Sequence, residues 1–378
     1  MYPFSGVVSG ILKTKVTDMK VGILTFPNSV SYGAVLQMYA LQQAVKQLGH
    51  DARVINYHNA YMKQERHVGK HDMKGRMKKT ARRVIHSRLY SNFRKFEREE
   101  LNLMPARAFS DAQKLSQVGG DCGAVICGSD QVWNPDITGA DLSYFLDFCG
   151  VNTRRVAYAP SFGIDQFPDA FCRTIQKELR QFHALSARET PGQRLTQELT
   201  EREVPLVVDP TLLLQAADWQ ALEHPHAAAT GDYILYYTVL SSKTLWKQAL
   251  ALSKKTGMKI VAVGGNWLKK RKNQDDQVEY AVDIGPKQWL YLVRNARYVV
   301  TNSFHGTAFA INYRKDFYVE FSSKTNSRLV QIVGDLGLTD RVVGEVPIEP
   351  AAADYSAAEQ VLPVMRQESW DYLSQALQ

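Results

Sequence analysis

Short apolar runs alternate with amphipathic segments along most of the chain. The runs at residues 21–26, 124–127 and 298–301 lack polar alternation, which is typical of parallel strands covered on both faces. After the first run, apolar residues at helical spacing predict a helix over 34–48, with Gly49 as its stop. Strands that alternate with helices in this way indicate a parallel α/β protein.

The alternation of strands and helices occurs twice, with a restart near Pro210. We therefore expect two Rossmann-like doubly wound domains, over residues 20–209 and 210–345. A helical tail over 346–378 is expected to pack back on the first domain. Further strands are predicted at 53–57, 156–159, 184–187, 206–208, 233–239, 259–263 and 317–320, and further helices at 244–255, 286–294, 306–313 and 327–336.

Ligands of open α/β sheets bind beyond the carboxyl ends of the strands. With two such domains, the cleft between them is the expected site, and the polar residues that end strands are its candidates. These residues are Asn28 to Tyr32, Ser129 to Gln131, Arg188, Asp209, and Ser303 to His305.

The positive charge of the chain is concentrated in one segment. The net charge is +8, but residues 63–98 hold thirteen Lys or Arg against three Asp or Glu, or +10. The remaining 33 basic and 35 acidic residues sum to −2. This basic helical insertion, at about 60–100, is either a solvated helix pair, a contact for an anionic lipid surface, or a region that attracts a phosphorylated substrate. Few aromatics are available to stack bases, so we expect no nucleic-acid partner.

Several classes of protein are excluded by composition. No apolar run approaches the length of a membrane-spanning helix, and the first twenty residues lack signal-peptide order. The four cysteines form no CxxC pair, and His and Cys are not clustered at zinc-ligand spacing. We therefore expect a cytoplasmic protein with reduced thiols and no metal.

Two strand ends carry cationic candidates. His305 lies between a predicted strand and helix, where it either binds a phosphate oxygen and transfers a proton or caps the helix. Gly306 permits close backbone approach at this corner, and the backbone amides of the helix that follows favour an anion. Arg188 also ends a strand; it either grips a phosphate or carboxylate or pairs internally with Glu189.

Two loops add further candidates. Lys324 and Arg328 lie in a loop rich in hydroxyls after the 317–320 strand; the loop is either solvated or a second anion grip beside His305. Asp130 is either a general base or part of an Asx-type turn, and Trp133 either stacks on a sugar ring or fills the cleft wall.

Seven stretches, in this order, make the chain resemble the polysaccharide pyruvyl transferase family over residues 21–340. They are GILTFPNSVSYGAVLQMYALQQAV, VICGSDQVWNP, RVAYAPSFG, LSARE, VVDPTLLL, VTNSFHGTAFAI and NSRLVQIVGDLGL. The resemblance implies two Rossmann-like domains in a GT-B-like arrangement with an inter-domain cleft. It also implies transfer of pyruvate from phosphoenolpyruvate to a sugar as a cyclic ketal, with release of phosphate and without a cofactor or metal. The sugar would belong to a lipid-linked precursor of a surface polysaccharide (exopolysaccharide or capsule).

By motif, the resemblance places the donor phosphate on Arg188, His305 and Lys324. Asn302 departs from relatives that carry an acid before SFHG.

From these patterns we expect His305 and Asp130 to be catalytic. Beside Arg188 and Lys324, the donor side is expected to include Ser303, Gly306 and Arg328. The predicted acceptor side comprises Asn28, Ser31, Tyr32, Ser129, Gln131 and Trp133. The alternatives are a GT-B glycosyltransferase that uses a nucleotide sugar and a non-catalytic protein that kept the fold. The expected partners are phosphoenolpyruvate, the sugar acceptor and, through the basic insertion, the inner face of an anionic membrane.

Overall fold

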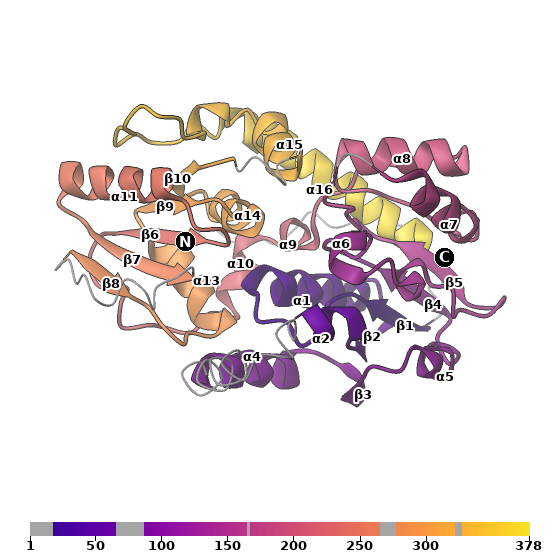
Figure 1. Cartoon of the computed structure of the whole chain (residues 1–378). Helices are drawn as coiled ribbons and strands as arrows, with labels where there is room; N and C mark the ends of the chain where they lie inside the picture. The colour runs from indigo at the N-terminus through magenta and orange to yellow at the C-terminus, as the bar shows by residue number, and fades with distance from the viewer. Residues whose placement is uncertain (1–17, 66–86, 165–166, 265–276, 322–326) are drawn as a thin grey trace, which may run out of the picture.

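The computed structural model describes residues 18–65, 87–164, 167–264, 277–321 and 327–378. Two parallel sheets of five strands each lie in separate halves of the molecule, with helices packed around both (Figure 1). Lys324, residues 1–17 and most of the basic insertion (66–86) lie outside the described residues.

Both sheets have the same doubly wound topology. The first has the order β3-β2-β1-β4-β5 and the second has the order β10-β9-β6-β7-β8, so the earliest strand of each is central. This is the 3-2-1-4-5 order of Rossmann-like folds, and it confirms the predicted fold class. The strands are β1 (Lys20–Leu24), β2 (Asp51–Tyr57), β3 (Leu103–Phe109), β4 (Ala124–Cys127), β5 (Arg154–Ala157), β6 (Tyr233–Thr238), β7 (Lys259–Gly264), β8 (Val278–Tyr280), β9 (Tyr298–Thr301) and β10 (Asp316–Val319).

The helices follow the predicted alternation. The longer ones are α1 (Tyr32–Gln47), α4 (Ser87–Glu100), α7 (Asp169–Leu179), α8 (Thr190–Thr200), α11 (Lys243–Thr256), α13 (Pro286–Asn295), α14 (Phe304–Asn312), α15 (Ser327–Asp335) and α16 (Ser356–Ala376). The short ones are α2 (Ala60–Glu65), α5 (Leu115–Gly119), α6 (Pro135–Thr138), α9 (Pro210–Leu213) and α10 (Ala216–Gln220).

Four strand predictions need correction. Residues 184–187 and 206–208 form only isolated bridges, through Ala184, Ala187 and Leu206. The unpredicted strands β3 and β8 each lie at one edge of their sheet, and the strands at the other edges, β5 and β10, were predicted. No residue of β3 or β8 is buried, so neither sequence has the continuous apolar run that marks a strand covered on both faces.

The two halves share one apolar core. A single cluster of buried residues contains Val35 and Leu36 of α1 together with Trp289 and Phe309 of the second half. Tyr32, at the start of α1, stacks on Trp289 with ring centroids 5.3 Å apart and planes at 9°. The start of α1 is therefore held inside the interface between the domains.

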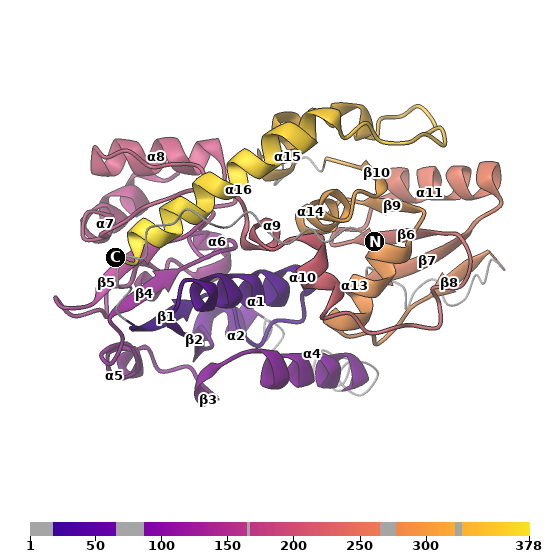
Figure 2. The same cartoon turned by 180° about the vertical axis from the view of Figure 1, so that it is seen from behind.

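The last helix, α16, connects both halves (Figure 2). The hydroxyl of Tyr355, which precedes α16, donates to the carbonyl of Lys315 in the second half, at 2.6 Å. Farther along, the Tyr372 hydroxyl donates to the Ala157 carbonyl in the first half, at 2.7 Å. None of the described helices is long and apolar enough to cross a membrane.

Candidate active site

Arg188 lies at the centre of a buried ionic cluster. Its Nη1 donates to Asp209 and to the Ser129 hydroxyl, the latter at 3.3 Å. Its Nη2 lies 3.8 Å from Asp130 Oδ1, and its Nε lies 3.8 Å from Glu189 Oε2. Both of those nitrogens are buried without a hydrogen-bond partner. One edge of the guanidinium fork is thus held, while the other edge is available to an anion.

Arg328 reaches the same cluster from α15 of the second domain. Its Nη1 lies 4.0 Å from Asp130 Oδ1, too far for a hydrogen bond. The guanidinium carbons of Arg188 and Arg328 lie 5.0 and 5.7 Å from the centroid of the Phe304 ring. Burial lowers the pKa of Arg328, and the like charge of Arg188 lowers it further. A second anion contact is therefore built beside the first.

His305 enters from the start of α14 and completes the cluster. Its Nε2 lies 3.6 Å from Asp209 Oδ2 and is buried without a hydrogen-bond partner. The imidazole and one guanidinium group thus lie against Asp209, and both guanidinium groups lie over the Phe304 ring. Arg188, which follows an isolated bridge, and His305, which follows β9, therefore meet between the domains.

A small cavity adjoins this cluster. It has a volume of about 110 Å³, and its lining includes Arg188, Asp209, Phe304, Arg328 and Gln331. Gln331 of α15 accepts from the backbone N–H of Thr190 at 2.9 Å, so the second domain closes over the first at this point. The cationic groups are partly enclosed, which strengthens their attraction for an anion.

Three strand ends of the first sheet have unusual backbone. Asn28, Asp130 and Ala159 follow β1, β4 and β5 with φ angles of 62°, 77° and 50°. Non-glycine residues rarely adopt this left-handed region, and such residues concentrate at functional sites. The carboxyl edge of the first sheet therefore has the character of a binding site.

Several predicted site residues have structural positions instead. The Ser303 hydroxyl accepts from the N–H of Gly306 at 3.2 Å, so both residues are used in capping α14. Ser129 is fully buried and belongs to the arginine cluster, not to an acceptor surface.

The two predicted aromatic acceptor contacts are also buried. Trp133 stacks on Phe145 at 5.3 Å, and its Nε1 donates to the Tyr144 carbonyl at 2.9 Å. Tyr32 is enclosed between the domains, and its hydroxyl donates to the Ile284 carbonyl at 3.2 Å. Neither ring has a free face for a sugar, because each contributes to a core.

The other predicted acceptor residues are partly exposed. Ser31 caps α1 by accepting from the N–H of Ala34 at 3.4 Å. The Gln131 side chain accepts from Asn134, and the Asn28 side chain donates to Asn56, each at 2.9 Å. These residues line the edge of the first domain, where their roles stay predictions, as does the role of Lys324.

Phe304 and Asp209 were candidates only as parts of strand-end stretches, and Glu189 was expected as an internal partner of Arg188, beside which it lies at 3.8 Å. Phe304 lies beside the predicted His305, but the two arginines that share its ring are 140 residues apart in the chain. The only sequence signal for Asp209 was its place at the end of a predicted strand.

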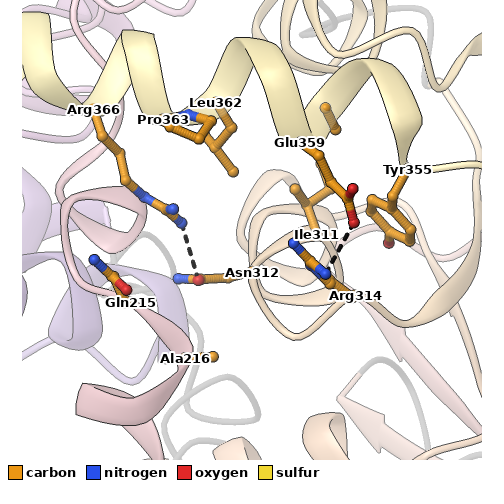
Figure 3. Close-up of a pocket in the computed structure, with 11 residues that line it drawn as sticks. Gln215, Ala216, Ile311, Asn312, Arg314, Tyr355, Glu359, Leu362, Pro363 and Arg366 are labelled. Atoms are coloured by element: carbon orange, nitrogen blue, oxygen red, sulfur yellow. Dashed lines mark hydrogen bonds and ion pairs between the residues drawn. The ribbon is translucent and has the colours of Figure 1, made fainter. Parts of the chain in front are cut away.

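A larger cavity of about 200 Å³ lies between α16, α10 and α14 (Figure 3). Its arginines are occupied: Arg314 pairs with Glu359 at 2.9 Å, and Arg366 donates to Asn312 at 3.1 Å. This polar pairing leaves no group directed at a ligand. Among the residues that the structure describes, no group of three or more His, Cys, Asp or Glu could hold a metal ion.

Solved structures similar to this chain include two nucleotide-sugar enzymes. UDP-GlcNAc 2-epimerase from Methanocaldococcus jannaschii is 10% identical with a TM-score of 0.49, covering 92% of this chain and 93% of that one. E. coli heptosyltransferase WaaC with ADP is 12% identical with a TM-score of 0.40, covering 84% and 98%. At these scores the similarities say nothing about activity. No curated protein sequence matches the chain.

The model of one protein family matches most of the chain. The match runs over residues 32–319, and the family is described as polysaccharide pyruvyl transferase. The matched region contains Asp130, Arg188, Asp209 and His305, which the structure brings together. This chain therefore belongs to the polysaccharide pyruvyl transferase family.

Proposed function

We propose that this transferase moves the pyruvyl group of phosphoenolpyruvate to two hydroxyls of a sugar, forming a cyclic ketal and releasing phosphate. The observation that carries the proposal is the unbonded edge of Arg188 beside the unbonded Nε2 of His305. Phosphoenolpyruvate has a phosphate and a carboxylate on adjacent carbons of one small skeleton. A buried guanidinium fork and an imidazole suit such an anion.

A bound phosphate can replace the Asp130 carboxylate as the partner of the two arginines. Arg188 and Arg328 lie 3.8 and 4.0 Å from Asp130, which is ion pairing without a hydrogen bond. A bound phosphate would make charge-assisted hydrogen bonds of about 2.7–2.9 Å instead. Each such bond contributes about 1.5–3 kcal/mol. We propose that Lys324 adds a further cation to the donor.

The proposed chemistry assigns the groups as follows. His305 holds the phosphate and gives a proton to the methylene carbon, which leaves an oxocarbenium-like centre. One sugar hydroxyl adds to that centre, phosphate departs, and the second hydroxyl closes the ring. Asp130, whose side chain is 16% exposed, takes the proton of the first hydroxyl, and the imidazole of His305, neutral after its proton transfer, takes the proton of the second. Asn28, Ser31 and Gln131 face the sugar.

We also propose that the acceptor is a lipid-linked polysaccharide precursor at the inner face of the membrane. The support is the position of α4, whose Glu97 accepts from the N–H of Asn28 at 2.7 Å. Its outward side exposes Arg88, Arg94 and Lys95 beside the acceptor edge. In a vesicle flotation assay, we expect binding to phosphatidylglycerol that falls with added salt, and no binding to phosphatidylcholine. Equal binding to both vesicles would contradict this part of the proposal.

The central test is ketal formation from phosphoenolpyruvate with a panel of lipid-linked and free sugars. We expect phosphate release and a product heavier by one pyruvate ketal. Replacing Arg188 or His305 by Ala should reduce turnover about a hundredfold or more. Arg314→Ala serves as the control, because Arg314 lies in the other cavity and is paired with Glu359.

Ligand binding separates the proposal from the glycosyltransferase alternative. Phosphoenolpyruvate should raise the melting temperature of the wild type but not of the Arg188 variant. Stabilisation by a nucleoside diphosphate, without any by phosphoenolpyruvate, would favour the glycosyltransferase.

A further inference from the structure

Asp209 lies between the catalytic groups of the two domains. Its Oδ2 accepts from Arg188 of the first domain and lies 3.6 Å from His305 Nε2 of the second. Its Oδ1 accepts from the N–H of Thr211 at 3.0 Å and from the Thr211 hydroxyl at 2.7 Å. Its Oδ2 also accepts from the Ser129 hydroxyl at 3.3 Å. These five contacts hold one carboxylate in a single orientation, and the side chain has no exposed surface.

This carboxylate is ionised. Burial acts to raise its pKa, but the attraction of His305 and Arg188 outweighs burial and holds the pKa of Asp209 below its usual value. At 3.6 Å the imidazole is close enough for charge attraction yet not hydrogen-bonded, so its Nε2 stays free for a substrate.

The opposite side of the imidazole lies against the backbone of Gly33, in the first turn of α1. A Cβ atom on Gly33 would lie 2.0 Å from His305 Nδ1 and 2.3 Å from its Cγ. Only a residue without a side chain leaves room for the ring at this position. The φ of Gly33 is not in the left-handed region, so space and not backbone conformation requires glycine.

We infer that Asp209 and Gly33 form a slot across the domain interface that positions His305 for catalysis. Asp209 faces Nε2 on one side of the ring, and Gly33 sets the depth of the ring from the other. Both act through His305, so both are positioning residues. The expected effect on turnover rests on the proposed function, but the position of the His305 ring between Asp209 and Gly33 does not.

Gly33→Ala tests the slot from the side of α1. A Cβ at 2.0 Å from the buried ring must displace either the ring or α1, so the melting temperature is measured beside turnover to separate a shifted ring from a loosened domain interface. We expect turnover to fall about a hundredfold from displacement of the ring. The matched control is Gly334→Ala in α15, where a new Cβ meets nothing within 4 Å. In the His305→Ala background, Gly33→Ala should have no further effect on turnover.

Asp209→Asn tests the other side and removes the charge while keeping the shape. Selective ¹⁵N-histidine NMR of the full chain, with His305→Ala to assign the signal, reports the tautomer and titration of the ring. We expect both Asp209→Asn and Gly33→Ala to change the His305 signal. If Asp209→Asn does not fold, Gly33→Ala decides alone.

The outcomes distinguish the slot from the proposed function. If the variants change the His305 signal but the wild type does not use phosphoenolpyruvate, the slot is supported and phosphoenolpyruvate is excluded as the donor. An unchanged His305 signal in the folded variants would overturn the slot, even if phosphoenolpyruvate is the donor.

Discussion

The Asn302 side chain donates from Nδ2 to the carbonyl oxygen of Leu240, at 2.8 Å. Its Oδ1 accepts from the N–H of Val239 at 3.1 Å. One amide thus holds both sides of the loop after β6, next to the strand end that carries His305. The position where relatives carry an acid has a structural use here that needs a donor and an acceptor together.

Replacing Asn302 by Asp should therefore loosen this loop. A carboxylate can accept from Val239 but cannot donate to Leu240, which leaves two oxygen atoms facing each other. We expect Asn302→Asp to lower stability by about 1–3 kcal/mol, measured by urea unfolding, without raising turnover. Higher turnover at unchanged stability would show that the position acts in proton transfer instead.

We expect Arg328 to contribute to anion binding and not to the stability of the folded protein. Its nearest carboxylate oxygen is 4.0 Å away, and Arg188 contacts the same aromatic ring. Arg328→Met should leave the melting temperature of the ligand-free protein equal or higher, because it removes like-charge repulsion. It should weaken phosphoenolpyruvate binding by roughly tenfold to a hundredfold, measured by calorimetry.

The control for this prediction is Arg314→Met, which removes an arginine paired with Glu359 at 2.9 Å. Binding of phosphoenolpyruvate should be the same in this variant and in the wild type. Equal affinity in the Arg328 variant would exclude Arg328 from the donor site.

The buried carboxyl of Glu97 should make the free energy of unfolding depend on pH. Burial raises its pKa from 4.5 to about 7, although the Asn28 N–H and Arg94 act in the opposite direction. In the unfolded chain this carboxyl ionises near 4.5, so its stabilising contribution is full below that pH. The contribution is lost as pH rises through about 7, a total of about 3 kcal/mol.

Glu97→Gln should remove that loss, because a glutamine oxygen still accepts from Asn28. Between pH 5 and pH 8, the unfolding free energy of the variant should change by about 3 kcal/mol less than that of the wild type. Glu99→Gln on the same helix is the control, since Glu99 is exposed beside Lys95. Identical pH profiles for Glu97→Gln and the wild type would contradict the prediction.

Trp133 should affect stability and not acceptor binding. Trp133→Phe loses the hydrogen bond to the Tyr144 carbonyl and part of the stacking on Phe145. We expect a loss of about 1–3 kcal/mol in the unfolding free energy, with the KM for the sugar unchanged. Gln131→Ala should show the reverse pattern, and a raised KM in the Trp133 variant would restore its predicted contact with the sugar.

The central strands were predictable because a parallel strand covered on both faces must be apolar throughout. The predicted bounds of β4 (Ala124–Cys127) and β9 (Tyr298–Thr301) match the structure. Strands β3 and β8 were missed because none of their residues is buried, so no continuous apolar run is required there, whereas the buried edge strand β10 was predicted.

The candidate site was predictable as a set of strand ends but not as a set of contacts. His305 follows β9 and Arg188 follows an isolated bridge, so each lies where the chain reaches the carboxyl end of its own sheet. Trp133 and Tyr32 were assigned to the acceptor because an aromatic near a strand end has the same sequence pattern whether it faces a ligand or a core.

The two α/β domains, the resemblance to the family and the strand ends proposed for the site could be predicted from the sequence, because periodicity and motif order are local properties. The bridging of Arg188 and His305 by Asp209, the contact of Phe304 with both arginines and the room that Gly33 leaves for the imidazole become visible only in the folded chain. Those relationships join residues from two domains, and their geometry depends on how the shared apolar core seats one domain against the other.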